Sequence, residues 1–442
     1  MSGVGRVENT LASTGLLPWV WPAMLSVGAV QVLLSDRNLA ESFLALQVVA
    51  EPPRPGLAVW WQRAVSLLLL VAAVEQVASH AALRRPVPSP MLLAAFLLYW
   101  VGTIGLPSVF GAHSSFSHEL LYAPTFGVAC CLAMPQEQAR MVRLARDSLM
   151  VLMLAGLAGL VVRPAMVADM SYAAGLLPGV PRFAGLTAHP VTQGLLAQVA
   201  LLLVWAAPYR HRGLRLASWG LALGVLLIAQ SKAAWIACAV CGLAMLAWRH
   251  GPQGWIRLAD PQRPQAGLLA WSLAGIAVLG LAIGLLMGDL AREVAHYLDS
   301  PDGAQWTSLT GRDRIWAVAA EEWRSHPVFG YGPTLWDAAY RASIGLPHAT
   351  HAHNQLMDDA ARAGTVGVLA LALYASALTV LAWRAGRATA ALSVGLLLAL
   401  ALRAISEVPL LLLGYGTDLF THGLLLATLA AAAAPSDSQV RA

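Results

Sequence analysis

Apolar runs long enough to cross a lipid bilayer recur along the whole sequence. Three examples are residues 16–34, 267–288 and 366–383. A transmembrane helix needs about 20 apolar residues. Hydrophobic residues make up 58% of the chain and charged residues only 12%, whereas soluble domains carry roughly 25% charged residues. The sequence therefore predicts an all-α integral membrane protein.

The apolar runs and the turn signals between them predict about twelve transmembrane helices. We expect them at 16–34, 57–83, 91–106, 119–134, 148–163, 191–207, 216–230, 233–247, 267–288, 366–383, 389–412 and 417–434. This pattern divides the chain into N-terminal helices (1–147), central helices (148–288), one large loop (289–365) and C-terminal helices with a short tail (366–442).

Arginines in the short loops set the expected orientation. They cluster at 84–85, 140–146, 210–215, 249–263 and 384–387. A twelve-helix alternation puts all these loops on one side, which the positive-inside rule identifies as the cytoplasm. Both termini are expected there, with the protein in a bacterial inner membrane and its first helix, which lacks signal-peptide features, retained as an anchor. Scattered arginines also argue against nucleic-acid binding.

The large loop at 289–365 is expected on the periplasmic side. It contains ten acidic residues, six basic residues and five histidines. Helical stretches such as DRIWAVAAEEW alternate with Gly/Pro turns such as HPVFGYGP. This alternation predicts a small, mainly helical folded cap rather than a flexible tether.

The loop ends in a histidine-rich segment, HATHAHN, just before an apolar helix. His353, at a membrane surface and a helix start, is a suitable proton acceptor. A surface histidine and a metal ligand are the alternatives. We expect no metal, because no carboxylate cluster or cysteine completes a site with His351 and His353. Cys238 and Cys241 form a C-x-x-C inside an apolar run, where packing is the favoured interpretation.

Cationic residues on the expected outer side are the second group of candidates. PRFAGLTAHP carries Arg182 and His189, QSKAAW carries Lys232, and GRDRIW carries Arg312. Positive charge on this side runs against the topological bias, and Arg and Lys are suited to holding phosphate. These residues could converge on a pyrophosphate, or each could pair with a nearby acid or lipid headgroup; both interpretations stay open.

Two opposite charges lie inside an apolar run near the C-terminus. Arg403 and Glu407 are four residues apart in ALRAISEVPL. On a helix this spacing places both on one face. We favour a structural ion pair there over a substrate contact.

The ordered motifs PRFAGLTAHP, QSKAAW, GRDRIW with HPVFGYGP, and HAHN with RAGTVGVL span residues 180–372. In this order they resemble the bacterial O-antigen ligase and polysaccharide polymerase superfamily. The resemblance implies a GT-C-like membrane glycosyltransferase. Its donor would be a glycan on an undecaprenyl-diphosphate carrier in the surrounding membrane lipids. The acceptor hydroxyl would belong to a lipid A core sugar or to another carrier-linked glycan. No metal or other cofactor is implied.

The resemblance also implies roles for single residues. His353 would take the proton of the acceptor hydroxyl during an inverting attack, and Asn354 would orient it. Arg182, Lys232 and Arg312 would stabilise the departing diphosphate, with His189 and His351 as further substrate contacts. The chain departs from the family pattern at two positions: Val191 stands where Asn is frequent, and Lys232 where Arg is frequent.

Two other classes of protein fit the helices. A transporter or flippase of lipid-linked glycans is the main alternative, although repeated halves and polar residues at the membrane midplane are not evident. A non-enzymatic scaffold would leave the outer Arg/His residues without a purpose.

Overall fold

The computed structural model describes residues 15–41, 56–172, 177, 179–258, 312–347, 349–414 and 416–434, with the backbone alone described for 250–258. The expected helix at 267–288 and the first part of the expected cap, residues 289–311, lie outside the described residues.

The described part of the chain is almost entirely helical, which confirms the all-α expectation. Six of its helices are long and apolar enough to cross a membrane. Three of them are α4 (Gly56–Ala82), α8 (Pro135–Val162) and α18 (Gln355–Ala385). The span Leu17–Leu34 contains α2 (Val20–Leu34), and the span Pro90–Phe110 contains α5 (Pro90–Trp100) and α6 (Leu106–Phe110). The sixth, Lys232–Arg249, is the first part of α12 (Lys232–Leu258). The protein is therefore a multi-pass membrane protein.

Shorter helices complete the bundle. They are α7 (Tyr122–Cys131), α10 (Pro190–Ala206), α11 (Arg212–Ile228), α19 (Leu392–Ala404) and α20 (Thr417–Ala433). Four bounds differ clearly from the expected ones. α12 continues well past residue 247, so it includes Arg249 and Arg257 of the expected 249–263 loop. α8 begins well before residue 148, so it includes the arginines of the expected 140–146 loop; α18 begins before residue 366; and α19 ends before residue 412.

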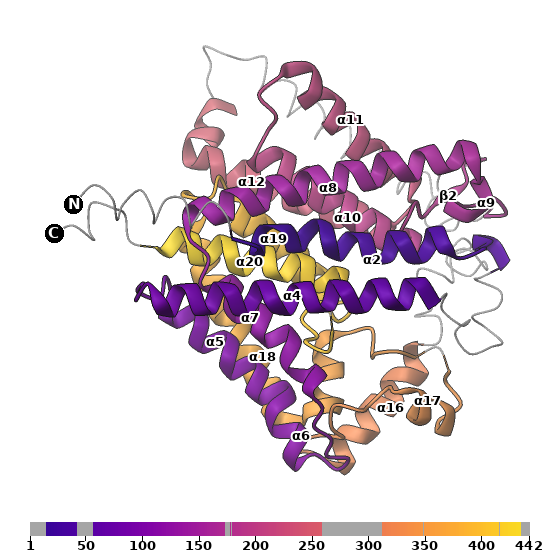
Figure 1. Cartoon of the computed structure of the whole chain (residues 1–442), viewed down its shortest axis with the longest axis vertical. Helices are drawn as coiled ribbons and strands as arrows, with labels where there is room; N and C mark the ends of the chain where they lie inside the picture. The colour runs from indigo at the N-terminus through magenta and orange to yellow at the C-terminus, as the bar shows by residue number, and fades with distance from the viewer. Residues whose placement is uncertain are drawn as a thin grey trace, which may run out of the picture.

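The bundle has two distinct ends (Figure 1). α2 begins and α20 ends at one of them, while the short elements α9 (Pro164–Val167), β2 (Arg182–Phe183), α16 (Arg312–Ser325) and α17 (Ala338–Ser343) gather at the other. We call this second end the cap end. All the candidate site residues described below belong to segments at the cap end.

Close packing of aromatic and small residues fills the centre of the bundle. Tyr99 of α5 and Tyr374 of α18 stack with ring centroids 4.7 Å apart. Phe96 packs edge-on against Tyr374 at 6.3 Å. Gly127 of α7 lies so close to Phe96 that an added Cβ would be 2.0 Å from the ring. These contacts pack α5, α7 and α18 tightly together, and a side chain at Gly127 would clash with Phe96.

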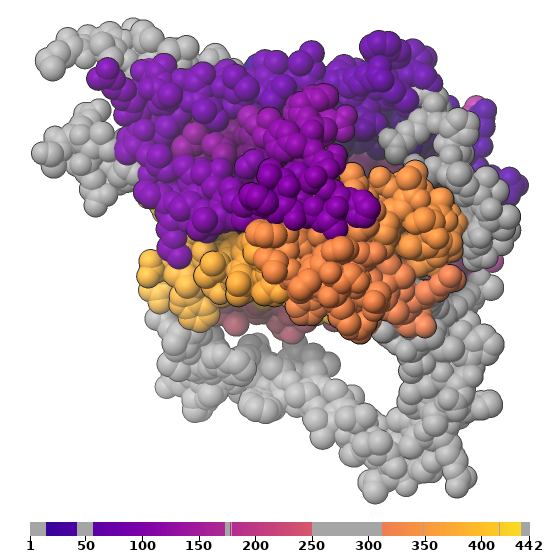
Figure 2. Space-filling view, turned by 90° about the horizontal axis from the view of Figure 1, so that it is seen from below, coloured from indigo at the N-terminus to yellow at the C-terminus, as the bar shows by residue number. Residues whose placement is uncertain are grey.

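The cap has an apolar core of its own. Its buried residues include Ile315 and Ala319 of α16, Trp336, Tyr340 of α17 and Leu346. The described part of the expected cap is thus a folded unit. Figure 2 shows its orange surface adjoining the purple surface of the N-terminal helices.

Backbone contacts fix the cap on α18. Tyr331 N–H donates to the carbonyl of Ala361 at 2.9 Å, and Gly332 N–H donates to that of Arg362 at 2.9 Å. The buried Arg362 guanidinium pairs with Asp358 at 3.0 Å and donates to the carbonyl of Leu335 at 2.8 Å. The first turns of α18 and the cap therefore form one rigid piece.

A two-stranded antiparallel ribbon lies at the same end of the bundle as the cap, across α2 and α4 from it (Figure 1). β1 (Ala168–Asp169) pairs with β2, so that Asp169 lies opposite Arg182. Arg37, just after α2, donates hydrogen bonds to the carbonyls of Met166 (2.6 Å) and Thr187 (2.8 Å). Burial lowers the pKa of Arg37 to about 10. These hydrogen bonds from the Arg37 guanidinium hold in place the loop that carries Arg182 and His189.

Candidate active site

The first turn of α18 positions the histidine-rich segment. Asn354 is its N-cap: the side-chain oxygen accepts the backbone N–H of Met357 at 3.0 Å. Its amide nitrogen donates to the carbonyl of Ile405 at 3.1 Å. Asn354 therefore joins the start of α18 to the loop that follows α19.

Three further hydrogen bonds hold the residues just before Asn354. Trp316 Nε1 donates to the carbonyl of Ala352 at 2.8 Å, and Ala352 N–H donates to Asp358 Oδ1 at 2.9 Å. His353 has a φ of 50°, a left-handed conformation that is uncommon for a residue with a side chain. Its N–H donates to His351 Nδ1 at 3.1 Å. The segment is thus held in one conformation by the cap.

Glu407 is the centre of the candidate site. Its carboxylate Oε2 lies 3.2 Å from His353 Nδ1 and 3.4 Å from His351 Nε2, and Oε1 lies 3.9 Å from Arg312. These four side chains are partly buried. The structure therefore brings His351, His353 and Arg312 together around one carboxylate that the sequence analysis did not include among the site residues.

The expected ion pair within one helix between Arg403 and Glu407 is wrong. α19 ends at Ala404, and Glu407 lies in the turn beyond it. Arg403 forms its ion pair with Asp418 of α20 instead. Its positive charge still acts on Glu407 from a distance. Glu407 is consequently free to face the cap.

The hydrogen bonds assign protons within this cluster. His351 Nδ1 accepts a backbone N–H, so neutral His351 carries its proton on Nε2 and donates it toward Glu407. Burial, followed by the charge of His353, lowers the pKa of His351 to about 4, so it is neutral at pH 7. Burial by itself would raise the pKa of Glu407, but the His353 hydrogen bond and the charges of His353, His351 and Arg403 bring it below its ordinary value. The carboxylate is therefore ionised.

Three of these side chains have the spacing of a metal site. Ligand atoms of His351, His353 and Glu407 lie within 4.8 Å of one another. However, a metal on His351 Nε2 would compete with the backbone hydrogen bond at Nδ1, because a neutral imidazole has only one unprotonated nitrogen. The sequence expectation that no carboxylate completes a site with His351 and His353 is therefore wrong, because Glu407 supplies one; in the hydrogen-bonded arrangement observed, His351 directs its proton at that carboxylate.

Arg182 and His189 form a second group near the first. The Arg182 guanidinium lies 5.0 Å from the centre of the Tyr172 ring. Burial lowers the pKa of Arg182, against the opposing effects of Tyr172 and Asp169. Its buried Nε has no hydrogen-bond partner among the described residues. A buried donor without a partner costs free energy unless a ligand or water satisfies it. Arg182 is therefore suited to an anionic ligand.

His189 links the two groups electrostatically. It caps α10, with Nδ1 accepting the N–H of Val191 at 3.1 Å. Burial and the charge of Arg182 lower the pKa of His189 to about 4, while Glu407 opposes the shift. Its proton thus sits on Nε2. The charges of both Arg182 and Glu407 thus act on His189, although Arg182 and Glu407 form no ion pair with each other within the described residues.

Lys232 begins α12, on the Arg182 side of the site. Gln230, in a left-handed conformation with φ 48°, donates to the carbonyl of Val180 at 2.7 Å. This bond ties the turn before Lys232 to the segment before Arg182. The structure thus places every candidate residue at the cap end, in two groups; their catalytic and binding roles stay predictions.

Comparison with known families agrees with this picture. Residues 216–372 match the family model described as O-antigen ligase, which confirms the resemblance to that superfamily. The matched segment contains Lys232, Arg312, His353 and Asn354, whereas Arg182, His189 and Glu407 lie outside it. No curated protein matches the chain. The match supports a membrane function of the O-antigen ligase or polymerase kind.

Proposed function

From the match of residues 216–372 to the O-antigen ligase family, we propose that this chain is an inverting, metal-independent membrane glycosyltransferase. It transfers a glycan from an undecaprenyl-diphosphate carrier to an acceptor hydroxyl. The acceptor is a lipid A core sugar or a growing surface polysaccharide. The observation that carries the proposal is the contact of His353 and Arg312 with one ionised carboxylate, Glu407.

In this mechanism His353 is the general base. Because Glu407 accepts the proton on His353 Nδ1, the unprotonated Nε2 is the nitrogen that takes the acceptor's proton. Glu407 is a positioning residue: it fixes the ring and its tautomer, and its charge stabilises the imidazolium that forms. Asn354 holds the loop carrying Glu407 against the start of α18.

The remaining cations act on the leaving group. As the acceptor oxygen bonds to the anomeric carbon, the bond from that carbon to the diphosphate oxygen breaks, and its electron pair leaves with the diphosphate. Arg312, Arg182 and Lys232 stabilise this developing charge, with His189 Nε2 as a hydrogen-bond donor beside it, while His351, whose one proton is directed at Glu407, contacts the substrate only through the rest of its ring. Preorganised cations of this kind contribute several kcal/mol to a transition state.

The proposal includes an arrangement in the membrane. About twelve helices form a GT-C-like bundle in a bacterial inner membrane, with both termini in the cytoplasm and the cap end in the periplasm. The arginine loops support this orientation. A carrier-linked donor then reaches Arg182 and Arg312 from the outer leaflet.

Reconstitution tests the proposal against its main alternative. Purified protein in proteoliposomes receives a carrier-linked glycan and an acceptor lipid, and both transfer and translocation are measured. We expect glycan transfer without added metal. Translocation of the carrier lipid without transfer would instead identify a flippase. In cells, deleting the gene distinguishes the two acceptors: accumulated carrier-linked polymer indicates a ligase, and single repeat units indicate a polymerase.

A further inference from the structure

A large pocket is lined in part by two segments that also support the candidate site, the loop after α19 and the cap. Its volume is about 860 Å³, and it opens between α2, α4, the segment 115–122 and the cap. Ligand pockets in proteins commonly enclose roughly 300–1,000 Å³. This pocket is therefore large enough for several sugar rings or for one ring and part of a lipid chain.

One wall is the loop that carries Glu407. Leu413 of that loop lines the pocket. Between these two residues, Leu410 N–H donates to Gln355 Oε1 at 2.9 Å, and its carbonyl accepts from the Tyr99 hydroxyl at 3.2 Å. The loop is therefore fixed to the first turn of α18 between the catalytic cluster and the pocket.

The second shared wall belongs to the cap. Thr334 and Asp337 line the pocket. Between them, Trp336 Nε1 donates to Asp358 Oδ1 at 3.0 Å, on the same turn of α18. A molecule in the pocket would thus touch two segments that also hold the His353 cluster in place.

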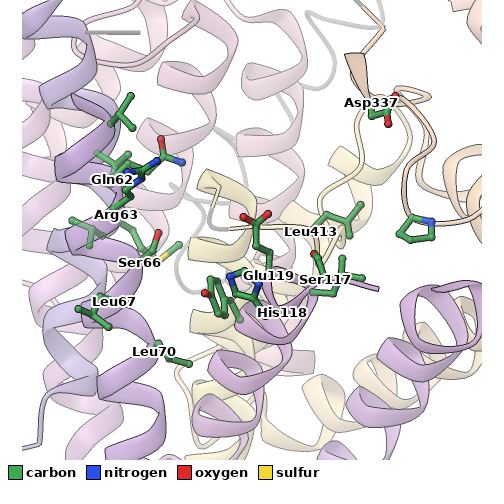
Figure 3. A pocket seen from close by; sticks show the side chains of 18 of the residues that line it. Gln62, Arg63, Ser66, Leu67, Leu70, Ser117, His118, Glu119, Asp337 and Leu413 are labelled. Carbon is green, nitrogen blue, oxygen red and sulfur yellow. The ribbon is translucent and has the colours of Figure 1, made fainter. Parts of the chain in front are cut away.

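The lining of the pocket changes from polar to apolar along α4 (Figure 3). Leu67 and Leu70 of α4 give one apolar side, while Gln62, Ser66 and Glu119 provide hydrogen-bonding groups. The apolar side continues into the exposed surface of α4, where Leu67 is 61% exposed and Trp60 67% exposed. A ligand that lies partly in the bilayer and partly among polar groups fits this lining.

The charges of the lining residues indicate which polar groups of a ligand the pocket can bind. Glu119 and Asp337 bring two carboxylates, against one guanidinium, Arg63, which lies 5.0 Å above the Trp60 ring. Carboxylates repel a diphosphate but accept hydrogen bonds from hydroxyls. The pocket is therefore unlike the Arg182 and Arg312 region, where the cations suit the donor.

We propose that this pocket binds the acceptor: the sugars and the adjoining apolar chain of a membrane-anchored glycan, held so that one hydroxyl reaches His353. The assignment rests on the proposed function for the direction of transfer, but the binding itself does not. The same chemistry could be supplied by a lipid A core or by a carrier-linked glycan.

The test fills the pocket with a bulky side chain. Ser66→Trp adds an indole to the lining, while Ala64→Trp, two residues earlier on the exposed side of α4, adds the same group outside it. Both proteins are purified in nanodiscs and compared by thermal unfolding. Binding of each acceptor is measured without donor, and KM for donor and acceptor is then measured separately. Glu119→Gln is the milder second variant, in case Ser66→Trp does not fold.

For Ser66→Trp we expect acceptor binding to weaken and the acceptor KM to rise by roughly tenfold or more. The donor KM should stay unchanged, and Ala64→Trp should behave as the wild type. The acceptor whose binding is lost identifies the source. A raised donor KM with unchanged acceptor binding would overturn the assignment, as would no change in either. Weakened acceptor binding in a protein that performs no transfer would support the pocket and refute the proposed function.

Discussion

His353 Nδ1 and Glu407 Oε2 lie 3.2 Å apart although 54 residues separate them in the sequence. The contact joins the start of α18 to the turn after α19. It fixes which nitrogen of His353 carries a proton, and therefore which nitrogen can receive one. The proposed chemistry follows from this pair, and each residue of it can be tested.

Glu407→Gln should keep the shape of the pair but remove its charge. We expect the transfer rate to fall by about 100-fold, because the imidazolium loses its ionic partner and its tautomer is no longer fixed. The pH dependence of kcat should change as well, and Glu407→Asp should restore part of the rate. A variant that only reduces the amount of folded protein, with an unaltered pH profile, would show that Glu407 is structural.

Arg312→Ala should impair use of the carrier-linked donor. We expect kcat/KM for the donor to fall by roughly 100-fold, since a preorganised cation near the leaving group is lost. The control is Arg324→Ala, in the same helix: Arg324 is exposed and pairs with Glu321 at the surface. Such a pair contributes little, so that variant should remain within about twofold of the wild type. Equal effects of the two substitutions would remove Arg312 from the donor site.

His351 should make stability depend on pH. Its pKa is about 4 when folded and 6.5 by its ordinary value, so the unfolded chain binds its proton first as the pH falls. Stability is then complete above about pH 6.5 and is lost progressively toward pH 4. His351→Asn should reduce the slope of the unfolding temperature in this range, leaving the smaller slope expected from His189. An unchanged slope would contradict the neutral, buried state of His351.

Gly364→Ala should disrupt the packing of the cap against α18. Gly364 has a φ of +65°, and an added Cβ would lie 2.4 Å from the carbonyl oxygen of Val328. Both the conformation and the space exclude a side chain. We expect a clear drop in the unfolding temperature together with loss of transfer. Gly224→Ala, in α11 with nothing within 4 Å of the added Cβ, is the matched control and should be neutral or slightly stabilising.

The sequence predicted the character of the fold and much of the candidate site. Apolar length depends on local composition, which is why most of the described helices overlap the expected ones. The arginines at 140–146 were expected in a loop but lie inside α8, because a helix can extend past its apolar part. The chemistry of His353, Arg312 and Arg182 was also visible, because histidines and cations on the outer side are unusual. Their gathering at the cap end could only be hypothesised from the order of the motifs.

Glu407 was missed for a physical reason. The spacing of Arg403 and Glu407 fits one face of a helix, so the helix was expected to continue through Glu407, whereas α19 ends at Ala404. Pro409 was the available signal, because a proline disfavours helical conformation in the residue before it. The partners of Glu407 come from α16 and from the start of α18, and sequence spacing carries no information about contacts of that range.

The most direct test of the central claim is the transfer rate of purified His353→Ala, compared with His326→Ala in the same cap, in proteoliposomes with a carrier-linked glycan and an acceptor lipid. His326 takes part in the cap through its backbone, so its variant should transfer glycan at a rate close to the wild type. His353→Ala should insert and fold but lose at least about 100-fold in rate, because no base remains for the acceptor hydroxyl. Near-normal transfer by His353→Ala would contradict the account.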